Sequence, residues 1–156
     1  MQSQRQFVNI ALIGFMGTGK TSVGRLVAEQ LHYDYIDTDD VIQTSTGRSI
    51  TDIFTKDGEP AFRSLEEDVV ADLATRTKTV IATGGGLPVN PHNLASLKTH
   101  ALVVCLWSSP EKIWERVRHQ SHGRQTLLRQ QQGSPRASSL PVFSLFLTYV
   151  SLPSAL

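Results

Sequence analysis

The chain has 156 residues, of which 40% are hydrophobic and 19% are charged, and this length and composition suit one domain with one buried core. Its single cysteine, Cys105, excludes an internal disulfide framework and agrees with a reducing compartment. The polar start over residues 1–6 lacks the apolar core of a secretion signal, and no stretch approaches the ~20 apolar residues of a membrane span. We therefore expect a cytoplasmic protein with no membrane partner.

The net charge of +1 conceals an asymmetry along the chain. Residues 1–124 carry 13 basic and 14 acidic side chains and hence a net charge of −1, whereas the only charges in residues 125–156 are Arg129 and Arg136. The basic balance therefore comes from the C-terminal end and gives no indication of nucleic-acid binding. We expect no nucleic-acid partner.

Short apolar runs alternate with segments of helical spacing along the chain. We expect strands over residues 7–13, 33–36, 79–82 and 101–107. We expect helices over residues 21–31, 39–46, 49–55, 60–75, 91–97 and 110–119, with Thr38 as the N-cap of the second helix. This alternation predicts an α/β fold, a three-layer α/β/α arrangement with a parallel sheet, in which ligands gather at the carboxyl ends of the strands.

A glycine-rich segment follows the first expected strand and precedes the first helix. The phosphate-binding pattern G-x-x-x-x-G-K-[ST] is matched by Gly14-Phe15-Met16-Gly17-Thr18-Gly19-Lys20-Thr21. Glycines let several N–H groups point at one anion, and the positive end of the next helix faces the same place. Lys20 suits the β- and γ-phosphates of a nucleotide, and the Thr21 hydroxyl suits Mg²⁺. The alternative, a chance match in a glycine turn, is disfavoured by the strand–loop–helix context.

Two further motifs follow the second and third expected strands. Asp37 and Asp39 can serve different partners, one holding Mg²⁺ through water and the other accepting a proton from a substrate hydroxyl. The alternative is that these acids only cap a helix start. The Gly84–Gly86 triplet lets a ligand approach the backbone closely, or else is a flexible turn before Pro88.

Two arginines are candidates for binding anionic groups. Arg63, early in the fourth expected helix, can clamp a substrate carboxylate with two parallel hydrogen bonds. The alternative is a surface arginine paired with Glu66 or Glu67 at helical spacing. Arg124 follows a polar stretch and can close over a transferring phosphoryl group as part of a lid, or else is a solvated loop residue.

Taken together and in this order, the motifs resemble those of the shikimate kinase family. The matching segments are Gly14 to Thr21, Asp37-Thr38-Asp39, Gly47-Arg48-Ser49-Ile50, Phe62-Arg63 with Glu66-Glu67, and Ala82-Thr83-Gly84-Gly85-Gly86. The resemblance runs from about Phe7 to Arg124. A phosphate-binding loop alone is generic, whereas its combination with Asp-Thr-Asp, Phe-Arg and Gly-Gly-Gly is much more specific.

The resemblance implies an adenylate-kinase-like P-loop fold and phosphorylation of the 3-hydroxyl of shikimate by ATP with one Mg²⁺ ion, a step toward chorismate and the aromatic amino acids. Its implied catalytic residues are Lys20, Asp39 and Arg124. Its implied ATP-binding residues are Gly17, Thr18, Gly19, Lys20, Thr21, Ser22 and Arg124. Its implied metal ligands are Thr21 and Asp37, and its implied substrate-binding residues are Asp39, Arg63, Gly84, Gly85 and Gly86. We expect a monomer.

The C-terminal end departs from the family, whose lid usually reads Arg-Pro-Leu-Leu where Arg124 is followed by Gln-Thr-Leu-Leu. We divide the chain into a P-loop kinase core over residues 1–124 and a divergent, poorly ordered tail over residues 125–156, with six serines, three prolines and no acid. A shifted reading frame near Arg124 explains this composition; the alternative is a divergent end that packs residues 142–150 where the family has its fifth strand or last helix. No motif gives Arg136 the role of the family's second substrate arginine, so we expect impaired activity. A missing edge strand would leave one side of the sheet unpaired and apolar, so we also expect poor stability.

Two other functions stay open at the level of sequence. Another P-loop small-molecule kinase, for gluconate or a nucleotide, has the same loop, but the set of Asp39, Arg63 and Gly85 favours a small polyol carboxylate over a nucleotide base. A degenerate or regulatory nucleotide-binding protein would bind ATP without phosphoryl transfer, because a site can survive after its supporting residues are lost.

Overall fold

The computed structural model describes residues 7–118, apart from the side chain of Val117. Its strands are β1 (Asn9–Ile13), β2 (Asp34–Asp37), β3 (Thr79–Ala82) and β4 (Ala101–Cys105). Its helices are α1 (Lys20–Leu31), α2 (Thr38–Thr46), α3 (Ile50–Asp57), α4 (Glu59–Leu73), the 3₁₀ helix η1 (Leu87–Val89), α5 (Pro91–His100) and α6 (Pro110–Val117). The type and order of the predicted elements are confirmed within this range, and only η1 was not predicted. No helix in these residues is long and apolar enough to cross a membrane.

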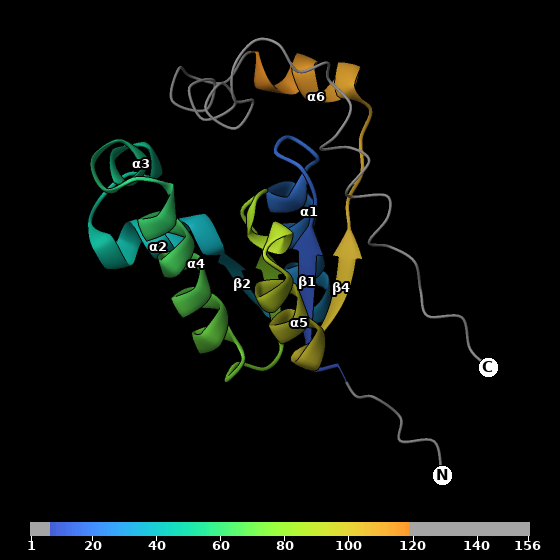
Figure 1. The fold of residues 1–156 in the computed structure, drawn as a ribbon. Coiled ribbons are helices and arrows are strands. Elements are labelled where there is room, and N and C mark those ends of the chain that lie inside the picture. The colour runs from blue at the N-terminus through green and yellow to red at the C-terminus, as the bar shows by residue number, and fades with distance from the viewer. Residues whose placement is uncertain (1–6, 119–156) are drawn as a thin grey trace, which may run out of the picture.

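The described strands form one parallel sheet in the spatial order β2-β3-β1-β4. Ala11 of β1 pairs with Ile81 on one side and with Val103 on the other. The chain leaves β1 toward the β2 side of the sheet and leaves β3 toward β4, on opposite sides of β1. Parallel sheets open a crevice at the carboxyl ends of strands where connections diverge in this way. Figure 1 shows α6 beyond this same end of the strands.

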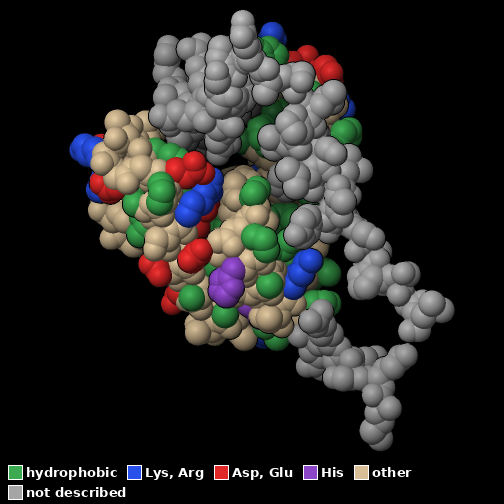
Figure 2. Space-filling model, viewed as in Figure 1, with side chains coloured by type: hydrophobic (Ala, Val, Ile, Leu, Met, Phe, Trp, Pro, Cys, Tyr) green, Lys and Arg blue, Asp and Glu red, His purple; other side chains and the backbone are tan. Residues whose placement is uncertain are grey.

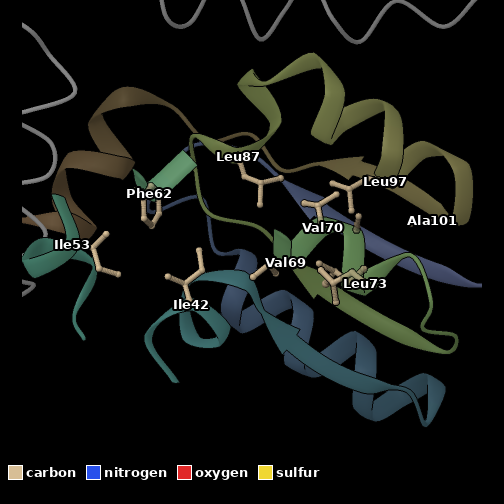
Figure 3. Packing of buried hydrophobic residues seen from close by; sticks show 11 residues of the cluster. Ile42, Ile53, Phe62, Val69, Val70, Leu73, Leu87, Leu97 and Ala101 are labelled. Atoms are coloured by element: carbon tan, nitrogen blue, oxygen red, sulfur yellow. The ribbon is translucent and has the colours of Figure 1, made fainter. Parts of the chain in front are cut away.

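Helices cover both faces of the sheet, as the three-layer prediction requires. Successive residues of β1 point to opposite faces, so Ala11 belongs to one buried cluster and Leu12 to the other. The larger cluster joins the sheet to α2, α3, α4, η1 and α5 (Figure 3) and includes Ile42, Ile53, Phe62, Val69, Val70, Leu73, Leu87 and Leu97. The smaller cluster joins Leu12 and Val80 to Ala28 of α1.

The residues that α1 buries are not the aliphatic ones that helical spacing groups on one side, although Val27 of that group packs against the smaller cluster. The spacing groups four aliphatic residues on one side, namely Val23, Leu26, Val27 and Leu31. In the structure the buried residues of α1 are Gly24 and Ala28, and Leu26 is 61% exposed. A Cβ at Gly24 would lie only 2.8 Å from Cε2 of Tyr35. The helix therefore approaches the sheet through its smallest residues, because a larger side chain would displace the tyrosine ring.

The N-cap of α2 is Asp37, and the prediction of Thr38 was wrong. Asp37 Oδ1 accepts a hydrogen bond from the Asp39 backbone N–H at 3.0 Å, as capping carboxylates do. The Thr38 side chain is fully buried, and its hydroxyl accepts a hydrogen bond from the backbone N–H of Gly84 at 2.9 Å. Thr38 therefore ties the start of α2 to the end of β3 instead of capping its own helix.

Candidate active site

The segment between β1 and α1 has the geometry of a phosphate-binding loop. Three of its glycines have positive φ angles, 138° at Gly14, 80° at Gly17 and 99° at Gly19, which glycine adopts at little steric cost. The Lys20 ammonium group donates hydrogen bonds to the carbonyl oxygens of Gly14 at 2.7 Å and of Phe15 at 2.9 Å. Because α1 begins at Lys20, its positive end and this cation face the same place. The arrangement can hold a chain of phosphates.

The other predicted nucleotide-binding residues differ in their surroundings. Thr18 is buried, and its hydroxyl donates to the Phe15 carbonyl oxygen at 2.8 Å, so it braces the loop from within. Ser22 is exposed in the first turn of α1. Arg124 and the predicted tail lie outside the described residues, and their roles stay predictions.

Thr21 and Asp37 bring a hydroxyl and a carboxylate together beside the loop, with Thr21 Oγ1 donating to Asp37 Oδ2 at 3.4 Å. Burial raises the pKa of Asp37 above its ordinary value, against the lowering effect of the Asp39 backbone N–H. Such oxygen donors fit Mg²⁺, which takes one or two protein oxygens and completes its shell with water and substrate phosphates. Residues 7–118 hold no group of three or more His, Cys, Asp or Glu suited to a metal. A Mg²⁺ ion at this pair would therefore depend on the nucleotide for further ligands.

Asp39 lies between the loop and the long helix α4. Its Oδ1 atom is buried and has no hydrogen-bond partner among the described residues. Burial, followed by the negative charges of Asp37 and Glu66, raises the pKa of Asp39 to about 6, while Lys20 lowers it. A carboxyl group with a pKa near neutrality and an unused acceptor oxygen is suited to take a proton from a hydroxyl.

Arg63 is held on α4 by two glutamates. Its Nη1 donates to Glu66 Oε2 at 2.7 Å, and its Nη2 donates to Glu59 Oε1 at 2.9 Å. Glu66 is only 1% exposed, and burial raises its pKa more than Arg63 lowers it. The predicted pairing of Arg63 at helical spacing is therefore confirmed for Glu66, whereas Glu67 accepts a hydrogen bond from Asn90. The pairing fixes the guanidinium group, with Nη1 2.7 Å from the position of a Cβ built at Gly86.

Each glycine of the triplet after β3 faces a different part of the site. A Cβ at Gly84 would lie 2.6 Å from Asp39 Oδ1, and a Cβ at Gly86 would lie 2.7 Å from Arg63 Nη1. A Cβ at Gly85 would lie 3.3 Å from the backbone nitrogen of Met16 in the phosphate-binding loop. The triplet therefore lies close to a carboxylate, a guanidinium group and the loop. The sequence predicted that the three motifs after the strands would gather, whereas the guanidinium group comes from α4.

Further ion pairs lie on α3, the helix that precedes α4. Arg48 donates to Asp57 and lies 3.4 Å from Asp52, and Lys56 Nζ lies 2.9 Å from the other oxygen of Asp52. Acidic and basic side chains accordingly gather over α3 and the start of α4 on the face seen in Figure 2. These exposed pairs link the segment after α2 to α3, and exposed pairs of this kind each contribute at most about 1 kcal/mol.

The sequence did not indicate Arg116 as a candidate. From α6, its Nη1 donates to the carbonyl oxygen of Gly17 at 2.9 Å. This contact brings a second cationic side chain to the loop that Lys20 closes. The only signal in the sequence is one arginine among the charged residues of an exposed helix, which gives no reason to select it.

Comparison with known proteins agrees with this geometry. The shikimate kinase family model matches residues 16–141. A shikimate kinase of Thermodesulfovibrio yellowstonii is 47% identical over 110 residues, covering 70% of this chain and 64% of the relative. One of Pelotomaculum thermopropionicum is 46% identical over 114 residues, covering 73% and 66% respectively. The chain thus matches slightly less than two thirds of the length of these two relatives.

Solved structures show the same fold. The shikimate kinase of Acinetobacter baumannii in complex with shikimate has a TM-score of 0.71 and 37% identity, covering 81% of this chain and 74% of that one. The shikimate kinase of Bacteroides thetaiotaomicron has a TM-score of 0.73 and 30% identity, covering 90% and 76%. On the evidence of the family match and these similar proteins, the chain belongs to the shikimate kinase family.

Proposed function

We propose that this chain transfers the γ-phosphoryl group of ATP to a hydroxyl of shikimate. The observation that carries the proposal is the convergence of Asp39, Arg63 and the Gly84–Gly86 triplet beside the phosphate-binding loop. A small polyol carboxylate has one group for each part of this site. Its carboxylate can pair with Arg63, one hydroxyl can bond to Asp39, and its ring substituents can contact the backbone of the glycine triplet. One solved relative, the shikimate kinase of Acinetobacter baumannii, is described in complex with shikimate, which supports the choice of substrate.

The nucleotide would be held by backbone and by two cations. N–H groups of the loop and the N-terminus of α1 would cradle the phosphates, and Lys20 would pair with their outer oxygens. Arg116 reaches the same loop through the Gly17 carbonyl and adds positive charge there. Mg²⁺, when bound by Thr21 and, through water, by Asp37, would neutralise charge on the phosphate oxygens.

The acceptor hydroxyl would be positioned by Asp39. As its oxygen bonds to the γ-phosphorus and the bond to the ADP oxygen breaks, its proton would pass to the Asp39 carboxylate. The raised pKa of Asp39, about 6, keeps this group largely ionised at neutral pH yet basic enough to accept the proton. Arg63, whose fork is already oriented by Glu59 and Glu66, would bind the shikimate carboxylate and fix which hydroxyl meets the phosphate.

The direct test is ADP release measured with ATP, Mg²⁺ and shikimate on protein of verified mass. We expect turnover that requires shikimate, at a rate reduced by the atypical C-terminal segment. In Lys20→Ala we expect turnover to fall at least about 100-fold, because a charge aimed at the transferred phosphoryl group is lost. Gluconate and a nucleoside monophosphate serve as control acceptors. ATP binding without shikimate-dependent turnover would contradict the proposal and favour a nucleotide-binding protein without catalysis.

A further inference from the structure

Tyr35 lies beside the metal-side carboxylate and takes no part in the proposed reaction as described so far. It precedes Asp37 by two residues on β2, and residues two apart on a strand point to the same face of the sheet. Its hydroxyl donates to Asp37 Oδ2 at 3.4 Å, the same oxygen that Thr21 Oγ1 approaches at 3.4 Å. The other oxygen, Oδ1, accepts the Asp39 backbone N–H at 3.0 Å. The Asp37 carboxylate is therefore contacted on both oxygens.

The tyrosine ring is itself fixed by α1. A Cβ at Gly24 would lie 2.8 Å from Tyr35 Cε2, so the helix backbone approaches the ring as closely as packing allows. The Arg25 guanidinium carbon lies 5.3 Å from the ring centroid, within the range of a cation–π contact. Tyr35 also packs against the cluster of Leu12, Ala28 and Val80. These contacts restrict the tyrosine ring and with it the position of the phenol oxygen.

The lengths of the two hydroxyl contacts indicate what they do. Hydroxyl–carboxylate bonds are usually about 2.5–3.0 Å long, so the two contacts of 3.4 Å are long and leave Oδ2 with acceptor capacity. That oxygen can still accept a hydrogen bond from a water in the shell of Mg²⁺.

We propose that Tyr35 is a positioning residue that holds the Asp37 carboxylate in the orientation required by the Mg²⁺ of a bound nucleotide. The inference rests on the nucleotide half of the proposed function and not on the identity of the phosphate acceptor. It extends the metal site beyond its ligands to the strand residue that aligns one of them. Groups that orient metal ligands typically change metal affinity 10–100-fold when removed, and the long contact places Tyr35 at the lower end.

The test measures ATP affinity of the full chain by calorimetry at a series of free Mg²⁺ concentrations. Mg²⁺ should raise the ATP affinity of both proteins. The free Mg²⁺ concentration that gives half of this increase should be about tenfold higher in Tyr35→Phe than in wild type. ATP affinity in EDTA should not change, because Lys20 and the loop backbone are untouched. Tyr33→Phe is the matched control: Tyr33 packs against the same cluster, but no hydrogen bond joins its phenol to Asp37 within residues 7–118. It should behave as wild type.

Three results would overturn the inference. They are an unchanged Mg²⁺ requirement in Tyr35→Phe, an equal shift in Tyr33→Phe, or an equal loss of ATP affinity in EDTA, which would show damage to the loop itself. Because shikimate is absent from the experiment, its result is independent of turnover. A tenfold shift in a protein that fails to phosphorylate shikimate would refute the proposed substrate and leave the role of Tyr35 standing.

Discussion

The two halves of the candidate site are built in different ways. The phosphate-binding loop is one continuous segment whose glycine conformations and lysine contacts are made within seven residues, Gly14 to Lys20. The substrate half collects Asp39 from α2, Arg63 from α4 and the glycine triplet after β3. The first half depends mainly on backbone geometry, whereas the second depends on buried charges held by other charges.

This difference has an energetic consequence. Backbone N–H groups in a loop bind anions without placing any charge in the protein interior. Glu66, by contrast, is buried, and Asp39 is half-buried with its Oδ1 atom fully enclosed. The pKa values of both carboxyl groups are raised chiefly by burial, which means that their ionised forms destabilise the folded state. The folded protein should therefore gain stability when the Asp39 carboxylate is neutralised, while the loop should gain nothing from losing its lysine.

The largest expected effect comes from Asp39→Asn. If Asp39 accepts the proton, kcat should fall by roughly 10²–10⁴. The pKa of Asp39 is about 6 in the folded state, against 3.8 for an ordinary aspartate. Between these pH values the folded state binds more protons than the unfolded state, so the stability of the wild type falls as the pH rises from 3.8 to about 6. The variant should then be more stable than wild type by about 1–2 kcal/mol at pH ~7.5, with the difference fading toward pH ~4.

Urea unfolding of ligand-free protein at the two pH values measures this difference. Asp34→Asn is the matched control, because it removes the same charge from an exposed position at the start of β2. It should change stability by less than about 0.5 kcal/mol and leave turnover intact. An Asp39→Asn variant that is no more stable than wild type at the higher pH would show that burial does not raise the pKa of this carboxyl.

A smaller effect is expected from Arg63→Met. The KM for shikimate should rise about 10–100-fold, the range for losing a hydrogen-bonded charge partner. Stability should fall by about 2 kcal/mol, because Glu66 stays buried without its cation. The double variant Arg63→Met with Glu66→Gln separates the two roles: it should restore stability but not KM. Recovery of both would mean that Arg63 serves only to neutralise Glu66.

The same contrast explains what could be predicted from sequence. The loop was predictable because its chemistry is encoded in adjacent residues, and Asp37, Asp39 and Gly84–Gly86 were predictable because parallel strands bring their carboxyl ends together. Arg116 was missed because its contact with Gly17 joins residues far apart in the chain, and no spacing rule encodes that. Thr38 was predicted to be the N-cap of α2. The sequence does not show that its side chain is fully buried and bonds to the backbone N–H of Gly84. Helical spacing groups the aliphatic residues of α1 and does not show that Gly24 and Ala28 are the residues buried against the sheet.

The smallest effects are expected from alanine substitutions at Gly84 and Gly86, which separate proton transfer at Asp39 from carboxylate binding at Arg63. Gly84→Ala would place a Cβ 2.6 Å from Asp39 Oδ1, and Gly86→Ala would place one 2.7 Å from Arg63 Nη1, so each alanine displaces a different functional group. Since misplacing a catalytic group slows the chemical step, Gly84→Ala should lower kcat about tenfold with a smaller change in KM. Gly86→Ala should raise the KM for shikimate by several-fold with kcat nearly unchanged.

Steady-state kinetics with shikimate varied at saturating ATP gives both parameters for both variants. Neither glycine has a positive φ angle, so backbone strain is not a competing explanation and steric displacement is the effect under test. The KM for ATP should stay constant in both variants, because the glycine nearest the phosphate-binding loop is Gly85. If the two variants instead changed kcat and KM in the same proportion, the triplet would act as one rigid turn, and Asp39 and Arg63 would not be separately positioned by it.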